Sequence, residues 1–306
     1  KGALMAHAYL VGCSGQARIV AAENAAMPAV SAPGYAKMKD ASFTFFGLGK
    51  GGSVGGLGCL FQFEDGSFFI VDGGHNTAVE AKDIYNKLRE LAPDKGRIVI
   101  RGWLITHAHS DHYGAFLKFA STYGSLGTIR IESFIFNFCN TPEQTQYLGD
   151  RDRSMSAVIS TIAGTYPGAA IYKPLTGQTF HYAGADMEVL YCMSDFLPQI
   201  IGTETPDADK ANADGNIQTV VFRMKLAGQT ILVTGDAAKV CVDDMCARYG
   251  ACLKSDMMTV PHHGWNENRY RARNGTIQLY TLVDPAVVFW PDGVKAQVKK
   301  MAWDGK

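Results

Sequence analysis

The feature that most constrains the fold is a repeated pattern in which a block of short apolar strands is followed by helices. The first block covers 42–71 and includes a hairpin whose turn, Glu64-Asp65-Gly66, suits the backbone angles of a tight turn. The second block covers 178–234. An amphipathic helix is predicted after the first block at 78–92, and a helix is also predicted after the second block at 237–249. We expect two sheets packed face to face with helices outside them.

Other apolar runs extend this pattern. Further strands are predicted at 98–105, 129–138, 257–260 and 287–290. Further helices are predicted at 113–123, in the middle of 142–172, and at 294–303. The polar, turn-rich stretch 196–215 predicts a surface insertion.

Composition narrows the class of protein. With 47% hydrophobic and 19% charged residues in 306 positions, the chain is not intrinsically disordered. Its length suits one large domain at 41–306 after an N-terminal extension at 1–40 of unknown role. Lys plus Arg and Asp plus Glu each number 29, so the net charge is zero. This balance argues against a dedicated DNA-binding module.

The sequence gives limited information on localisation. No apolar run approaches the ~20 residues of a membrane span. Leu10-Val11-Gly12-Cys13 is similar to a lipoprotein cleavage box, but His7 interrupts the apolar segment before it. The seven cysteines form no CxxC pair and read as buried thiols. A cytoplasmic location is slightly favoured over a surface lipoprotein or a secreted protein.

The strongest chemical signal is the run Thr106-His107-Ala108-His109-Ser110-Asp111-His112, which follows an apolar strand and precedes a helix. Three imidazoles and one carboxylate fall within six residues of a chain that has only eight histidines. Imidazole and carboxylate are the natural ligands of zinc and similar metals. The run therefore predicts a metal site rather than a solvated polar loop.

Two later strand ends carry similar side chains. Asp236 follows the apolar strand 231–234, and His262 and His263 follow the strand 257–260. Gly235-Asp236 alone is a weak signal, because an acid in this position is also a common helix N-cap. Together with the histidine run, these strand ends predict one shared centre.

These motifs resemble those of the metallo-β-lactamase fold superfamily. The resemblance covers about 42–291 and rests on Asp72-Gly73-Gly74, His107-x-His109-x-Asp111-His112, Gly235-Asp236 and His262-His263-Gly264. Within that superfamily, the chain looks like the hydrolase domain of bacterial DNA-uptake competence proteins. That closer resemblance rests on Asn216-x-x-Thr219, on 253–264 and on Asp284-Pro285-Ala286-Val287-Val288.

The resemblance implies a four-layer αββα sandwich of the α/β class with two divalent metal ions, zinc first and manganese or iron as alternatives. His107 and His109 would hold one ion. The second would be held by Asp111, His112 and either His262 or His263, with a slight preference for His262 because it comes first off the strand. Asp236 would bridge both ions. Asp72 would orient ligands, and Asp111 would also orient the nucleophile.

One departure from the family pattern concerns the first metal. The superfamily usually supplies another histidine between His112 and Asp236, and here only His181 lies in that interval. The remaining ligand of the first metal ion could be His181, Asn137, Asn140 or a water molecule.

Other residues near the motifs are candidate substrate contacts. His75, Trp265 and Asn266 could line the site, or they could be loop residues without a role. Arg269, Arg271 and Arg273 could receive a phosphate, but a solvated loop is the simpler reading. The glycines at 47–52 match a dinucleotide fingerprint formally, yet a strand rather than a helix follows them.

The resulting hypothesis is a hydrolase that uses a metal-activated water on a phosphodiester. Zero net charge favours a small-molecule substrate over a long nucleic acid, which would need a basic track. One alternative is a hydrolase of lactones, thioesters or β-lactams. The other is a non-catalytic, degenerate fold used for binding.

Overall fold

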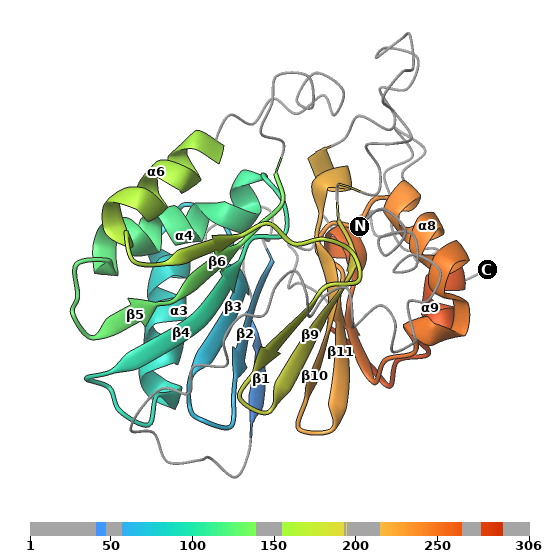
Figure 1. The fold of residues 1–306 in the computed structure, drawn as a ribbon, viewed down its shortest axis with the longest axis horizontal. Coiled ribbons are helices and arrows are strands. Elements are labelled where there is room, and N and C mark those ends of the chain that lie inside the picture. Colours follow the sequence, from blue (N-terminus) through green and yellow to red (C-terminus); the bar gives the residue numbers. More distant parts are fainter. Residues whose placement is uncertain are drawn as a thin grey trace, which may run out of the picture.

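The computed structural model describes residues 41–46, 57–138, 155–192, 194, 215–264 and 277–289. Within them two β-sheets lie face to face, each covered by helices on its outer side (Figure 1). The expected four-layer α/β sandwich is confirmed. Residues 1–40, the final helix at 294–303 and nearly all of the insertion at 196–215 lie outside the described residues, so the proposed domain division stays a prediction.

The first sheet has seven strands in the described part of the chain, ordered β1-β2-β3-β4-β6-β7, with β5 also paired to β4. The hairpin strands β1, β2 and β3 are antiparallel, whereas β4 pairs in parallel with β3, β5 and β6, and β6 with β7. The strands are β1 (Ser42–Phe45), β2 (Gly58–Gln62), β3 (Phe68–Asp72), β4 (Ile98–Leu104), β5 (Ile129–Ile131), β6 (Ser133–Ile135) and β7 (Ala170–Tyr172).

The second sheet has six strands among the described residues, ordered β13-β12-β11-β10-β9-β8. Strands β8 to β11 are antiparallel, and β11, β12 and β13 are parallel. The strands are β8 (Thr179–Tyr182), β9 (Ala185–Tyr191), β10 (Val221–Leu226), β11 (Gln229–Val233), β12 (Met257–Thr259) and β13 (Val287–Phe289).

Helices cover the outer face of each sheet (Figure 1). The first sheet is covered by α3 (Ala78–Leu91), α4 (Ser110–Tyr123) and α6 (Met155–Thr165), and the second by α8 (Lys239–Tyr249) and α9 (Ile277–Val283). Thr77 caps α3 by accepting the Glu80 amide at 3.2 Å, which satisfies one of the open amides of the first turn.

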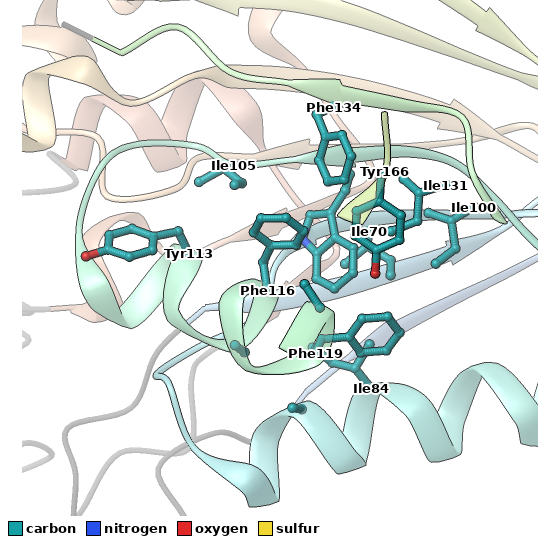
Figure 2. Close-up of a cluster of buried hydrophobic side chains, with 14 of the residues drawn as sticks. Ile70, Ile84, Ile100, Ile105, Tyr113, Phe116, Phe119, Ile131, Phe134 and Tyr166 are labelled. Carbon is teal, nitrogen blue, oxygen red and sulfur yellow. The ribbon is translucent and has the colours of Figure 1, made fainter. Parts of the chain in front are cut away.

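Buried side chains fill three layers between these elements. Alternation along the strands sends Ile70 to the helix side and Val71 to the space between the sheets, so both strand faces are apolar. Figure 2 shows the helix-side cluster, where Phe116 of α4 packs against the strand residue Phe134 and Phe119 of α4 lies near Ile84 of α3. Leu232 packs in the third layer, against the helices of the second sheet.

The parallel pairings determine where the chemistry lies. Since β3, β4 and β6 run in the same direction, their carboxyl ends meet at one edge of the first sheet. The same holds for β11 and β12 in the second sheet. Ligand sites of α/β proteins form beyond such carboxyl ends.

Several local expectations differ from the structure. The run 129–138 contains two short strands, β5 and β6, on either side of Glu132. Both pair with β4 in the same register, and the Glu132 amide donates to the Ile100 carbonyl at 2.9 Å. Strand β7 and helix α9 were not expected. Within the second predicted block, 178–234, a short 3-10 helix, Gly215–Gln218, precedes β10.

The cysteines largely match the expectation of buried thiols. Among the described residues, Cys59, Cys192, Cys241 and Cys246 are buried and free. Cys252 differs, because it is disulfide-bonded. No helix in the described ranges is both long and apolar enough to cross a membrane.

Arg101, the charged residue inside β4, is buried in an ion network. Its guanidinium donates to Asp65 at 2.7 Å, to Glu132 at 2.9 Å and to the Ser67 hydroxyl at 3.2 Å. The side chain of Arg101 is only 5% exposed. A buried charge is tolerated when such partners satisfy it.

We expect Arg101→Ala to lower the free energy of unfolding by about 3–5 kcal/mol, because two poorly solvated carboxylates lose their cation. Urea unfolding followed by circular dichroism measures the change. Lys254→Ala is the control, since its ion pair with Asp284 is exposed, and it should change stability little. Equal effects of the two substitutions would contradict the role assigned to Arg101.

Candidate metal centre

Two groups of ligand side chains converge where the carboxyl ends of the strands meet. His107, His109 and Asp236 form one group, and within it the ligand atoms lie within 4.8 Å of one another. The second group meets the same limit and consists of Asp111, His112, Asp236 and His263. Asp236 belongs to both groups. The structure thus brings together the strand-end residues that the sequence singled out, from both sheets.

Local structure explains how the first-sheet ligands reach this point. His107 and His109 lie in the turn after β4, and His109 is the N-cap of α4. Asp111 and His112 lie in the first turn of that helix, where the helix dipole favours a carboxylate. A strand, the five-residue connection 105–109 and a helix start therefore direct four side chains to one place.

The second sheet contributes Asp236 through a turn that requires glycine. Gly235 has φ of 50°, and a Cβ there would lie 2.5 Å from the Thr219 hydroxyl. That same hydroxyl accepts the Asp236 amide at 3.2 Å. The glycine therefore allows Thr219 to hold the backbone of the shared carboxylate.

The adjacent residues His262 and His263 have different surroundings. Both have left-handed backbone angles, with φ of 47° at His262 and 53° at His263. Nε2 of His263 lies 3.2 Å from Asp236 and 3.3 Å from Asp111. Nε2 of His262 lies 3.8 Å from Asp236 and pairs with the Asn216 amide nitrogen at 3.3 Å. The geometry places His263 in the ligand group, although the sequence slightly favoured His262.

Asp72 lies behind the ligands and is fully buried. Its carboxylate accepts the Thr106 amide at 2.7 Å and the Thr106 hydroxyl at 2.8 Å. Nδ1 of His112 lies 2.9 Å from the same carboxylate. Because Nδ1 donates to Asp72, Nε2 of His112 is directed toward Asp236, 3.2 Å away. This carboxylate–imidazole pairing is the arrangement that orients a metal ligand.

Thr106 and Thr219, to which the sequence assigned no role, hold the carboxylates Asp72 and Asp236 in place. Thr106 connects Asp72 to the histidines, and its carbonyl accepts the Val220 amide at 2.9 Å. Thr219 lies next to Val220 and holds Asp236. The segment before β10 thus links both sheets at the site. The Asn216-x-x-Thr219 motif was the signal in the sequence, but spacing alone did not reveal its function.

Opposite charges dominate the electrostatics of the second group. Burial opposes charge on His112, but Asp236, Asp72 and Asp111 raise its pKa well above the usual range. Burial also opposes charge on His263, whose pKa Asp236 and Asp111 nevertheless raise to about 9. Burial would raise the pKa of Asp236, but His112 and His263 hold it well below its usual range.

In the first group, the pKa of His107 shifts in the direction opposite to those of His112 and His263. Burial, followed by the nearby His112 and His109, lowers the pKa of His107 well below its usual value. His107 is therefore a neutral imidazole with a lone pair available at neutral pH. A metal ligand must be in this state.

The residues present fit metal ions. Buried atoms in the described structure that have no hydrogen-bond partner include Nε2 of His112, Oδ1 of Asp236 and both ring nitrogens of His263. Leaving such a group unsatisfied costs about 1–3 kcal/mol. A divalent cation would satisfy donor atoms of these types, which suit zinc, manganese and iron.

The remaining candidate residues either belong to neither ligand group or lie outside the residues that the structure describes. His75 belongs to neither ligand group and is half-buried beside α3. His181 is on β8 with its side chain 55% exposed, 2.7 Å from Asp186. Asn137 is fully buried near the carboxyl end of β6. The candidates that lie outside the described residues are Asn140, Trp265, Asn266, Arg269, Arg271 and Arg273.

Known proteins share this architecture. The family model described as the metallo-beta-lactamase superfamily matches residues 59–132. The metallo-beta-lactamase fold protein YhfI from Bacillus subtilis is similar in structure, with TM-score 0.50 and 11% identity, over 86% of this chain and 92% of that chain. The chain has the metallo-β-lactamase superfamily fold.

Two further structures with lower scores resemble this metallo-β-lactamase-fold chain. CmlA, a diiron beta-hydroxylase from Streptomyces venezuelae, has TM-score 0.43 and 12% identity over 78% of this chain and 44% of that chain. Zn(2+)-bound PqqB from Methylobacterium extorquens has TM-score 0.40 and 13% identity over 66% of this chain and 58% of that chain. No curated protein matches the sequence. These matches give no specific support for the competence-protein subgroup.

We expect metal binding to release protons and to tighten as pH rises. Before binding, His112 and His263 carry protons at neutral pH, because their pKa values lie above the usual 6.5. A ligating imidazole must be neutral, so affinity should rise between about pH 6.5 and 9. Zinc titration calorimetry at pH 7 in buffers of different ionisation enthalpy counts the protons. Binding without proton release would show that these two imidazoles are already neutral in the metal-free protein, contrary to this expectation.

Proposed function

We propose that the protein is a metal-dependent hydrolase with two divalent cations, zinc first among the candidates. The observation that carries this proposal is the pair of ligand groups sharing Asp236. When bound, two divalent cations lower the pKa of a water molecule from 15.7 toward about 7 and so supply a nucleophile at neutral pH. His107 and His109 would hold one cation, and Asp111, His112 and His263 the other, with Asp236 between them.

The protein's own groups position the reactants. Asp72 fixes the tautomer and the ring orientation of His112, and Thr106 fixes Asp72 in turn. The side chain of Asp111 is 22% exposed, whereas that of Asp236 is 3% exposed. Asp111 therefore lies on the open side of the site, where its carboxylate can orient the attacking water.

The open side also indicates where substrate enters. Like Asp111, the side chain of His262 is 22% exposed, and His109 is partly exposed as well. The buried residues Asp72, His107 and His112 close the opposite side. A substrate would approach between the turn after β4 and the turn after β12.

We further propose a small phosphodiester as the substrate. Motif resemblance to the competence-protein hydrolase domain supports this choice, and paired cations suit a phosphoryl group because they stabilise both the attacking and the leaving oxygen. The equal count of 29 basic and 29 acidic residues supports a small molecule, because a long nucleic acid requires a basic track.

Substitution of ligands tests the hydrolase proposal. Asp236→Ala removes a ligand from both groups and His109→Ala from one, so we expect both variants to lose metal-dependent hydrolysis. The matched control is His181→Ala, because that imidazole is exposed and paired with Asp186. Turnover and bound metal are measured together on purified protein. Turnover like that of the wild type in either ligand variant would overturn the proposal.

A substrate panel tests the phosphodiester. With added zinc or manganese, the protein should cleave bis-(p-nitrophenyl) phosphate and leave lactones, thioesters and β-lactams intact. Cleavage of a carbonyl substrate alone would replace the phosphodiester with that class. A protein that purifies nearly free of metal and cannot be loaded with it would instead indicate a non-catalytic fold.

A further inference from the structure

The two ligand groups are unequal in size. The group of Asp111, His112, Asp236 and His263 offers four ligand atoms, whereas His107, His109 and Asp236 offer three. Zinc in proteins is most often four-coordinate. Apart from the shared Asp236, the smaller group offers two ligands and the larger group three, so one more donor from this chain would make the two groups equal.

A buried amide near the same sheet edge has an unused oxygen. Asn137 has 0% exposure, and its Oδ1 has no hydrogen-bond partner among the described residues. Its Nδ2 donates to the Pro174 carbonyl at 2.9 Å and to the Ser194 hydroxyl at 3.2 Å. Because a carbonyl oxygen only accepts, the Pro174 contact fixes which branch of the amide is nitrogen.

Strand register places Asn137 at the level of the histidine turn. Ile135 of β6 pairs with Leu104 of β4, and its carbonyl accepts the Ile105 amide at 2.9 Å. Asn137 comes two residues after Ile135, and Thr106, which directly precedes His107, comes two residues after the register partner Leu104. Adjacent strands lie about 4.8 Å apart, so these positions are neighbours at the sheet edge.

The amide also points in a suitable direction. Ile135 packs between the sheets and Phe136 on the helix side, so alternation sends Asn137 into the space between the sheets. Its nitrogen is held by Pro174, just beyond β7, and β7 pairs with the side of β6 away from β4. The two branches of an amide diverge, so Oδ1 is directed toward β4.

Ser194 shows on which side of the centre Asn137 lies. Ser194 comes just after β9, whereas His263 follows β12 at the other side of the second sheet. Asn137 therefore lies on the side of the centre away from His263. The ligand group on that side is the smaller one.

We infer that Oδ1 of Asn137 is the fourth protein ligand of the metal ion bound by His107, His109 and Asp236. The neutral amide oxygen takes the place for which the sequence offered only His181, and Pro174 and Ser194 fix its orientation. A neutral oxygen is a harder donor than an imidazole, so this position should accept manganese as well as zinc.

Metal titration tests this inference without relying on catalysis. Apoprotein of the wild type and of Asn137→Ala is titrated with Zn²⁺ against a chromophoric chelator, giving the number of ions and both dissociation constants. We expect Asn137→Ala to bind one ion like the wild type and the other about 10–100-fold more weakly, the range seen when groups supporting a metal site are removed. Two unchanged dissociation constants would overturn the inference.

Two companion variants separate ligation from packing. Ser133→Ala on the same strand loses a buried hydrogen bond to the Arg101 carbonyl, 2.6 Å long, and should bind both ions like the wild type. Asn137→Asp keeps the volume and offers a charged oxygen, so it should bind both ions at least as tightly as the wild type. If Asn137→Ala does not fold, Asn137→Asp decides, and weaker binding of either ion by it would overturn the inference.

The inference rests on the proposed function in one respect only, namely that the wild-type protein binds two metal ions. A wild type that binds no ion would contradict the metal-dependent hydrolase itself. A wild type that binds two ions, together with an unaffected Asn137→Ala, would contradict the ligand role of Asn137 alone.

Discussion

A single buried carboxylate, that of Asp236, determines how the rest of the centre is arranged. Its side chain is 3% exposed, and it lies 3.2 Å from both His112 and His263. A buried charge of this kind is tolerated only with partners of opposite sign or a cation. The two sheets must therefore present imidazoles to the same point, and Gly235 and Thr219 hold the carboxylate there.

The sequence was sufficient wherever local spacing determines position. An apolar strand followed at once by a helix forces the ligands of the histidine run together, and Asp236 at a strand end could be assigned to the same edge. The choice between His262 and His263 could not be predicted, because it depends on two successive left-handed residues. For residues other than glycine, the residue type alone does not indicate a positive φ.

The parts of the fold that escaped prediction have weak local signals. Strand β7 has three residues and helix α9 has seven, both too short to show a clear period. The ion pair of Glu132 with Arg101 joins residues that are 31 positions apart, so it leaves no periodic trace in the sequence. Likewise, the unused oxygen of Asn137 follows from contacts with Pro174 and Ser194, which are remote in sequence.

The order of the ligands along the chain has a consequence for protein synthesis. The turn after β4 contributes His107 through His112, but neither ligand group is complete until Asp236 has emerged from the ribosome, and the larger one must also wait for His263. A nascent chain therefore carries a cluster of histidines long before it can retain an ion firmly. Metal capture would report that the second sheet has docked on the first, so loading and completion of the fold become a single late event.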